Sequence, residues 1–294
     1  SCCSSPTGSC GPRSCGISML SGRKSLPCFE VPDHEERRMS NSLLEVRSLS
    51  RSFGGLKAVN EGSFTVNQGS IKSVIGPNGA GKTTLFNVIS GMLPCDSGVV
   101  LQNGREITRL QPYRIAELGI SRTFQTTKLF SRMTVAENVM VGRHSRTKAG
   151  FFSGVLSLPW TWREEREIRE RSLELLDALG MADAAGQLAS NLPFGKQRLL
   201  EIARALATEP SLLLLDEPAA GLNIYETREM ADLVLRIREW GITVLLVEHD
   251  MSLVMDISDQ IVVLNYGRKV AEGKPAEIQR DPEVIRIYLG SEHA

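Results

Sequence analysis

A glycine-rich stretch that ends in lysine and threonine is the part of the sequence most able to do chemistry. It comprises the residues Gly76, Pro77, Asn78, Gly79, Ala80, Gly81, Lys82, Thr83 and Thr84. Glycines let the backbone curl so that successive N–H groups face phosphate oxygens, and a helix starting near Gly81 adds the positive end of its dipole. Lys82 would reach the β- and γ-phosphates, and the Thr83 hydroxyl can bind Mg²⁺. The pattern predicts a nucleoside-triphosphate site, and a glycine-rich turn without a ligand is the alternative.

A pair of carboxylates follows a run of four leucines further along the chain. Leu212–Leu215 predicts a buried parallel strand, and Asp216 and Glu217 come directly after it. Sheets of this class bind ligands at the C-terminal ends of their strands. We expect Asp216 to hold Mg²⁺, through water, and Glu217 to orient or deprotonate an attacking water. The same pattern also occurs where a strand enters a solvated loop, but the phosphate-binding loop favours the catalytic interpretation.

A histidine follows another apolar run, in the sequence Val-Glu-His-Asp. Residues Ile242–Val247 predict a further strand of the same sheet, and His249 comes two positions after it. At that edge the imidazole would be able to donate a hydrogen bond to the γ-phosphate. A single histidine beside a strand is usually structural, so this candidate depends on the other two motifs.

Composition and charge exclude several classes of function. The 294 residues include 34 basic and 34 acidic ones, and this balance argues against a broad nucleic-acid-binding surface. Apolar runs are about four residues long, whereas a membrane-spanning helix needs roughly 20, so the chain is not expected to cross a membrane by itself. No basic start followed by an apolar stretch and a cleavage site is visible, so no secretory signal is predicted.

The elements that must position these residues alternate between strands and helices. Further strands are expected at Leu43–Val46, Phe64–Val66 and Ile71–Ile75, and helices at Arg163–Leu179, Leu199–Ala207 and after Asp281. Strands therefore occupy both ends of the chain and helices its centre. This order predicts an α/β fold with a mainly parallel sheet, namely a P-loop NTPase (RecA-like) core with an inserted α-helical subdomain at about residues 126–206.

The first 40 residues differ from the rest in composition and in hydrophobic pattern. They hold five of the six cysteines, namely Cys2, Cys3, Cys10, Cys15 and Cys28, and they show no apolar periodicity. We expect a disordered leader, or sequence translated ahead of a true start at Met39, and a single domain over residues 41–294. A zinc-binding tract is the alternative, although the spacing does not match paired Cys-x-x-Cys motifs. With only Cys95 elsewhere, no disulfide framework holds the fold, which is typical of a cytosolic protein.

Together these motifs resemble the ATP-binding cassette (ABC) family over about residues 43–290. Thr123-Phe124-Gln125 resembles its Q-loop, Leu192 to Arg198 stands at its signature motif, and Ala219 to Asn223 stands at its D-loop. The resemblance implies ATP and Mg²⁺ as cofactors and adds three residues to the candidate set. Gln125 would sense Mg²⁺ and report to membrane subunits, Gly195 would offer its N–H to a γ-phosphate, and Phe53 would stack on adenine. A core position is the alternative for Phe53.

The resemblance assigns roles to the whole candidate set. The implied catalytic residues are Lys82, Gln125, Glu217 and His249. The implied metal ligands are Thr83, Gln125 and Asp216. In the family, two cassettes close on ATP, so that the phosphate-binding loop of one faces the signature helix of the other.

Three residues in two motifs depart from the general family pattern. The usual signature is Leu-Ser-Gly-Gly-Gln, whereas this chain has Pro193 and Phe194 in place of the serine and first glycine, and Asn223 replaces the usual D-loop aspartate. These departures resemble one branch, the ATP-binding subunits of branched-chain amino acid importers. The strings that begin at Phe53, Arg122, Glu217 and Val284 resemble the same branch.

The resemblance also implies the setting of such a subunit. It predicts an ATPase on the cytoplasmic face of the cell (inner) membrane, with membrane permease subunits, a second ABC ATPase subunit and, indirectly, a substrate-binding protein as partners. Permease docking is expected between Gln125 and about Arg146. The stretch at 150–160 would touch the membrane or the permease, or pack on its own subdomain. The alternatives are an ATPase for urea or amide uptake or lipopolysaccharide export, or a cassette protein that acts on nucleic acid.

Overall fold

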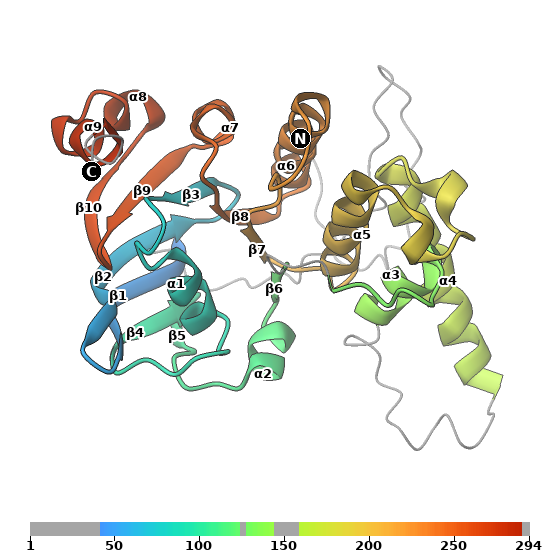
Figure 1. The fold of residues 1–294 in the computed structure, drawn as a ribbon. Helices are drawn as coiled ribbons and strands as arrows, with labels where there is room; N and C mark the ends of the chain where they lie inside the picture. The colour runs from blue at the N-terminus through green and yellow to red at the C-terminus, as the bar shows by residue number, and fades with distance from the viewer. Residues whose placement is uncertain (1–41, 124–127, 144–158, 290–294) are drawn as a thin grey trace, which may run out of the picture.

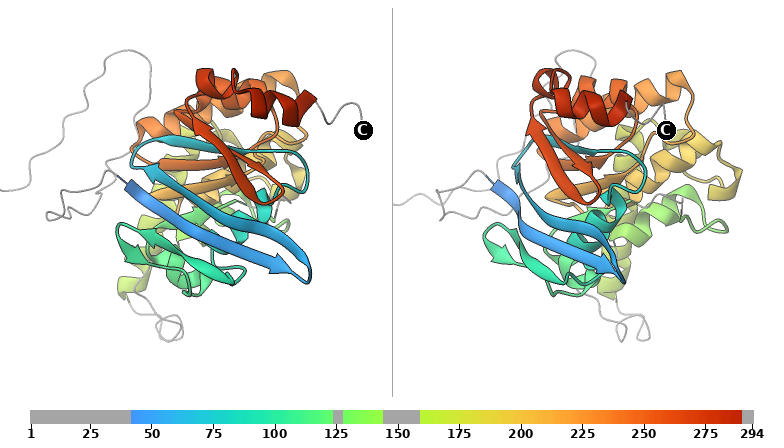
Figure 2. Two further views of the ribbon diagram at one scale, coloured as in Figure 1. Left: turned by 90° about the vertical axis from the view of Figure 1, so that its left-hand side faces the viewer. Right: turned by 60° about the vertical axis from the view of Figure 1, so that its left-hand side comes forward.

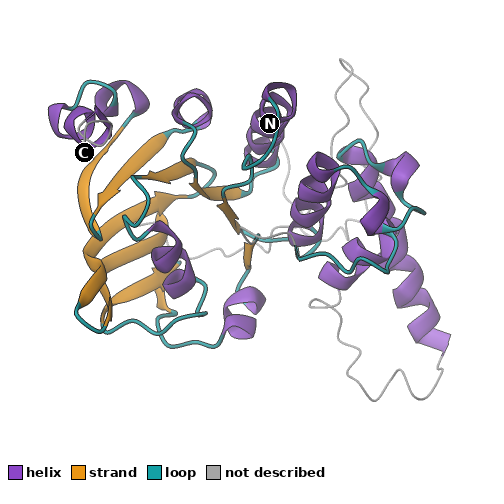
Figure 3. Ribbon diagram, in the orientation of Figure 1, coloured by secondary structure: helices purple, strands orange, loops and turns teal. Residues whose placement is uncertain are grey.

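The computed structural model describes residues 42–123, 128–143 and 159–289. The predicted leader, Gln125 and the 150–158 part of the predicted insert lie outside these residues. Within them, two β-sheets pack together and a group of helices stands to one side (Figures 1 and 3). The mixed α/β class is therefore as the sequence predicts.

The smaller sheet has four strands in the order β2-β1-β4-β5. Its members are β1 (Ser42–Phe53), β2 (Leu56–Asn67), β4 (Ser97–Gln102) and β5 (Arg105–Glu106), and all neighbours run antiparallel. The expectation that the first two strands join a mainly parallel sheet is wrong. Only Gly54 and Gly55 separate β1 from β2, and a two-residue connection permits only a hairpin.

The larger sheet has six strands and contains the predicted parallel core. The order is β10 (Arg268–Gly273), β9 (Gln260–Asn265), β3 (Ile71–Ile75), β8 (Thr243–Val247), β7 (Leu212–Asp216) and β6 (Ile120–Arg122). All neighbours are parallel except β10, which forms a hairpin with β9. The C-terminal ends of β3, β7 and β8 therefore share one edge, and each is followed by a loop with candidate site residues.

Helices cover both sheets and form the separate group between β6 and β7. The longer helices are α1 (Lys82–Ile89), α3 (Val135–Arg143), α4 (Pro159–Ala178), α5 (Phe194–Leu206), α6 (Ile224–Glu239) and α9 (Pro282–Leu289). The shorter ones are α2 (Pro112–Glu117), α7 (Met251–Ile257) and α8 (Pro275–Ile278), with 3₁₀ turns at Ala182–Ala184 and Ala189–Asn191. Helix α3 packs against both α4 and α5, and this group stands to one side of the sheets, in contact with the larger sheet through α5 (Figure 1). Helix α5 begins five residues before the predicted Leu199, because Pro193 serves as its N-cap.

Three apolar clusters hold these layers together. One lies between the two sheets and includes Leu85, Phe86 and Ile89 of α1, which is thereby fixed between the sheets. A second joins the opposite face of the larger sheet to α5 and α6. The third packs α7, α8 and α9 against β3 and β9, so that the end of the described chain lies against the strand that precedes the phosphate-binding loop (Figure 2).

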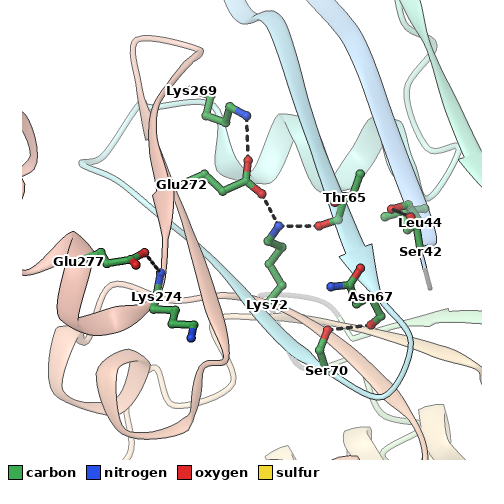
Figure 4. Close-up of polar contacts among 10 residues, drawn as sticks. All are labelled: Ser42, Leu44, Thr65, Asn67, Ser70, Lys72, Lys269, Glu272, Lys274 and Glu277. Atoms are coloured by element: carbon green, nitrogen blue, oxygen red, sulfur yellow. Dashed lines mark hydrogen bonds and ion pairs between the residues drawn. The ribbon is translucent and has the colours of Figure 1, made fainter. Parts of the chain in front are cut away.

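A buried lysine links the sheets on the side opposite the candidate site. Lys72 is the second residue of β3, its side chain is 1% exposed, and its amino group donates to the Thr65 carbonyl of β2 and to the Glu272 carboxylate of β10 (Figure 4). Lys269 also donates to Glu272, at 2.8 Å. Burial lowers the pKa of Lys72, whereas Glu272 opposes that shift. A charge without water needs such partners, so Glu272 is the counter-ion that Lys72 requires.

The two partners of this ion pair should differ in their importance for stability. Glu272→Ala leaves an uncompensated charge at a fully buried site and is expected to lower the free energy of unfolding by about 3–5 kcal/mol. Lys72→Met keeps the apolar stem and leaves Glu272 paired with Lys269, so a loss of about 1 kcal/mol or less is expected. Urea unfolding of both variants measures the difference. Equal losses of unfolding free energy in the two variants would contradict the inference that Lys72 needs Glu272 as its counter-ion more than Glu272 needs Lys72.

No helix among the described residues is long and apolar enough to span a bilayer.

Candidate functional site

The phosphate-binding loop lies between a buried strand and a helix, as the sequence predicts. All of β3 is buried, the loop starts at Gly76, and α1 begins at Lys82. Asn78 and Gly79 are exposed at the tip, whereas Ala80 is buried and accepts a hydrogen bond from the Gly267 N–H at 3.0 Å. Thr83 is exposed and Thr84 half-buried in the first turn of α1, where backbone N–H groups have no helical partner. The site thus presents backbone donors and the positive end of a helix to an anion.

Two of the glycines are required by close contacts with other strands. A Cβ on Gly76 would lie 2.1 Å from the Leu264 carbonyl oxygen, and one on Gly81 would lie 2.0 Å from that of Ala58. Both residues also have positive φ, at 151° for Gly76 and 99° for Gly81. No other residue type fits these two positions, so neighbouring strands fix the path of the loop at both of its ends.

Lys82 lies inside the loop rather than in solvent. Its side chain is buried, and its amino group donates to the carbonyl oxygens of Gly76 at 2.7 Å and Pro77 at 3.1 Å. Burial lowers the pKa of Lys82, whereas the nearby carboxylates of Glu217 and Asp216 act in the opposite direction. The loop therefore holds its cation next to the two carboxylates of β7.

Asp216 is buried at the C-terminal end of β7 and is held by an arginine of the adjacent strand. Its Oδ2 accepts from Arg122 at 2.9 Å, and the side chain is 1% exposed. Burial raises the pKa of Asp216, and Arg122 opposes that shift. Arg122 also donates to Asn87 and Ser90 of the α1 region, at 2.7 and 2.9 Å. One guanidinium thus connects the carboxylate of β7 with the helix that follows the phosphate-binding loop.

Glu217 has a strained backbone, which is common at functional sites. Its φ is 50°, in the left-handed region that non-glycine residues rarely occupy. Its N–H donates to the Val247 carbonyl of β8 at 2.9 Å, and its side chain is 16% exposed. The surrounding loop therefore holds Glu217 in a fixed position that still reaches the surface.

His249 lies beside Glu217, and the two residues follow the adjacent strands β8 and β7. Its Nδ1 is 4.0 Å from Oε2 of Glu217 and 3.8 Å from Oε2 of Glu248, and its side chain is 59% exposed. The exposure argues against a packed structural histidine. The structure therefore brings Lys82, Asp216, Glu217 and His249 to one edge of the larger sheet, at the ends of β3, β7 and β8.

The other predicted residues lie apart from this group or outside the described residues. Gln125 is outside them, so its predicted position stays a prediction. Phe53 ends β1, is 45% exposed, and has the Arg51 guanidinium 5.0 Å from its ring centre. The alternative that Phe53 is a core aromatic is wrong, because nearly half of it faces solvent.

Gly195 lies in the first turn of α5, in the separate helical group and across from α1 (Figure 1). Pro193 is the N-cap of α5, a position at which the missing N–H breaks no helical hydrogen bond. The Pro193 carbonyl accepts from Gln197 at 3.0 Å. The first-turn N–H groups, including that of Gly195, are at the positive end of α5 in spite of the altered signature.

The departure at Asn223 leaves the N-terminal cap of α6 intact. The Asn223 side chain accepts from the N–H groups of Tyr225 and Glu226, and the Glu226 carboxylate accepts from the Asn223 N–H at 3.0 Å. Asparagine and aspartate are equally good in such a capping box. The Glu226 carboxylate also lies against Gly195, since a Cβ on that glycine would be 2.6 Å from Oε1.

The residues at the site fit a divalent cation of the magnesium type. Oδ1 of Asp216 is buried and has no hydrogen-bond partner among the described residues. The Thr83 hydroxyl is exposed at the start of α1. Hard cations take oxygen ligands, and Mg²⁺ usually keeps several waters, so one carboxylate and one hydroxyl are an adequate protein contribution.

Two residues of this site are absent from the sequence-based set. Arg122 holds Asp216, and Glu248 is a fully buried carboxylate directly before His249. Arg122 begins one of the stretches that resemble the branched-chain amino acid importer branch, but nothing in the sequence predicts its contact with Asp216. An acidic residue between a buried strand and a candidate catalytic histidine is the signal that would have singled out Glu248.

Comparison with known proteins gives consistent matches over most of the chain. Residues 59–220 match the family model of the ABC transporter, and residues 268–294 match that of the branched-chain amino acid ATP-binding cassette transporter. The chain is 47% identical over 253 residues to the high-affinity branched-chain amino acid transport ATP-binding protein LivG of Salmonella typhimurium, covering 86% of this chain and 99% of that protein. It is 45% identical to BraF of Pseudomonas aeruginosa, which has the same description, with the same coverage.

A similar solved structure is the ADP conformation of MJ1267, an ATP-binding cassette of an ABC transporter. It has a TM-score of 0.75 and 33% sequence identity, over 85% of this chain and 100% of that one.

Proposed function

Because this chain belongs to the ABC transporter family, as one of its ATP-binding cassettes, we propose that it powers a membrane importer for branched-chain or similar hydrophobic amino acids. The chain is an ATPase. The observation that carries the proposal is the meeting of Lys82, Asp216, Glu217 and His249 at one sheet edge. The match of residues 268–294 and the identity of 45–47% to the LivG and BraF proteins support the amino-acid branch.

The residues at the edge divide the work of hydrolysis. The backbone N–H groups from Gly76 to Thr84 and the Lys82 amino group would bind the phosphates. To do so, the amino group would give up its hydrogen bonds to the Gly76 and Pro77 carbonyls. Thr83 and Asp216 would hold Mg²⁺, as would Gln125. The ion, when bound, neutralises charge on the phosphates.

Hydrolysis itself depends on Glu217 and His249. Glu217 would orient the attacking water and accept its proton at a carboxylate oxygen, and His249 would donate a hydrogen bond to the γ-phosphate oxygens. Phe53 would stack on adenine, with Arg51 on its ring.

A second cassette would complete the site. Gly195 lies on α5, apart from this chain's own phosphate-binding loop, so the N-terminus of α5 would serve ATP held by a partner. Permease subunits would dock near residues 125–146 and place the cassette on the cytoplasmic face of the membrane, and a substrate-binding protein would act indirectly. The balanced charge of the chain fits a partner other than nucleic acid. Residues 41–294 would form the ATPase domain, with helices at about 126–206 as its inserted subdomain.

Transport by the reconstituted complex tests the proposal. The chain is expected to copurify in detergent with membrane permease subunits, and proteoliposomes that contain the complex and its binding protein should take up labelled leucine when ATP is present inside. Uptake should disappear with Glu217→Gln and persist with Glu229→Gln, which removes an exposed charge of α6. Uptake of urea but not leucine would point to the other importer branch. Salt-sensitive DNA or ribosome binding without permease subunits would contradict the proposal.

A further inference from the structure

The Glu248 carboxylate joins the two loops that hold Glu217 and His249. Glu248 follows β8 directly and is 0% exposed. Its Oε1 accepts from the Ala219 N–H at 2.8 Å, two residues after Glu217, and its Oε2 accepts from the His249 N–H at 3.1 Å. The Asp250 N–H contributes a further hydrogen bond. One side chain therefore binds backbone on both sides of the Glu217–His249 pair.

Burial of a carboxylate at a turn costs free energy. Transfer of an ionised group out of water is unfavourable unless hydrogen bonds replace the lost water, and here burial raises the pKa of Glu248 in spite of its backbone donors. The hydrogen-bond partners described above for this carboxylate are backbone N–H donors, for which a carboxylate offers acceptors on both oxygens. A glutamine of the same shape would turn its NH₂ group toward one of these donors.

The backbone around His249 is fixed at both of its neighbours. Asp250 caps α7 by accepting from the N–H groups of Ser252 and Leu253 at 2.9 and 3.1 Å. Glu248, the residue before His249, is anchored to the loop after β7 by its hydrogen bond from the Ala219 N–H. Between these anchors only the His249 side chain is exposed, and its Nδ1 lies within 4.0 Å of both glutamates.

We propose that Glu248 is a positioning residue for ATP hydrolysis, which holds His249 beside Glu217 by binding the backbone of both loops. The inference rests on the proposed function, in which these two side chains act on the same phosphate. Glu248 itself is buried and does not touch substrate. Loss of its anchoring should move His249 away from Glu217 without changing the loop that binds ATP.

The test compares Glu248→Gln in two backgrounds, wild type and His249→Ala, by single-turnover hydrolysis with the full chain. In the wild-type background, kcat should fall roughly tenfold or more, because small displacements of catalytic groups have large effects on rate. The Kd for ATP should stay within about twofold. In the His249→Ala background, the same substitution should change kcat by less than about twofold, since it acts through a side chain that is no longer there.

Glu272→Gln is the matched control, because it removes a carboxylate charge from the Lys72 ion pair on the opposite side of the sheet. It is expected to lower the melting temperature and leave kcat unchanged. This control separates destabilisation from mispositioning. If Glu248→Gln does not fold, Glu248→Asp replaces it, since the aspartate keeps the charge but is one methylene too short.

Several outcomes would overturn the inference. They are a wild-type kcat in a folded Glu248 variant, an equal loss in both backgrounds, a loss confined to ATP affinity, or failure of both variants to fold. Absence of ATP hydrolysis by the unmodified chain would instead count against the proposed function.

Discussion

Replacing Glu217 with glutamine is expected to stop most ATP hydrolysis while leaving ATP binding intact. General base catalysis contributes about 10²–10⁴-fold to rate, and glutamine keeps the size of the side chain but cannot accept the proton of the attacking water. The phosphate-binding loop, Lys82 and Asp216 do not depend on this carboxylate for their hydrogen bonds. Steady-state hydrolysis and calorimetric ATP titration measure the two effects separately. Undiminished hydrolysis would exclude Glu217 as the catalytic carboxylate.

The same variant tests whether two cassettes pair, because ATP that is not hydrolysed would keep a closed pair together. Light scattering with and without Mg-ATP gives the solution mass. A nucleotide-driven doubling of mass would show that Pro193 and Phe194 still make a competent signature and that the chain pairs with itself. A monomer that binds ATP would require a second, different cassette. Glu229→Gln is the control, since it removes one exposed charge of α6 and should neither slow hydrolysis nor trap a dimer.

Lys82→Ala is expected to weaken ATP binding by about 30-fold or more. Removal of one partner of a buried charge pair costs about 2–5 kcal/mol, and the buried Lys82 amino group is the cation proposed to bind the phosphates. The substitution also leaves the Gly76 and Pro77 carbonyls without their donor. Titration calorimetry measures the affinity, and circular dichroism checks that the variant is folded.

Arg109→Ala is the matched control for Lys82→Ala. Arg109 is an exposed cation in the connection between β5 and α2, so its removal should leave ATP affinity unchanged. Near-normal affinity of a folded Lys82→Ala protein would show that the loop binds phosphate in another way, or not at all.

The sequence predicts the parallel strands of the site well because they are buried on both faces. Residues Ile71–Ile75 form β3 with the predicted bounds, and β7 extends the predicted Leu212–Leu215 by only Asp216. Such strands appear as short continuous apolar runs with clear ends. In β1, by contrast, only Leu43–Val46 is apolar enough to be recognised. In the rest of that strand only Leu49 is buried, the other residues are half-buried or exposed, and the pairing contains register shifts against β2.

The residues that support the site could not be found from sequence alone. Arg122 and Asp216 are 94 positions apart, and Glu248 and Ala219 are 29 apart, so only the strand order brings each pair together. Neither contact leaves a spacing pattern along the chain. Lys72 gives a misleading signal, because a lysine normally marks an exposed position, and only the Glu272 carboxylate of a strand 200 residues later explains its burial.

The contact between the D-loop and the N-terminus of α5 affects how two sites in a pair communicate. The Phe194 ring covers Gly221, where an added Cβ would lie 3.0 Å from Cε1, and Glu226 lies against Gly195 while it caps α6. The segment that starts at Glu217 is therefore attached to the helix end that would serve the partner's ATP. In a pair of cassettes, ATP bound at one site would then change the position of Glu217 at the other. A pair of cassettes built in this way is expected to use ATP cooperatively, with a sigmoidal rather than hyperbolic dependence of the hydrolysis rate on ATP concentration.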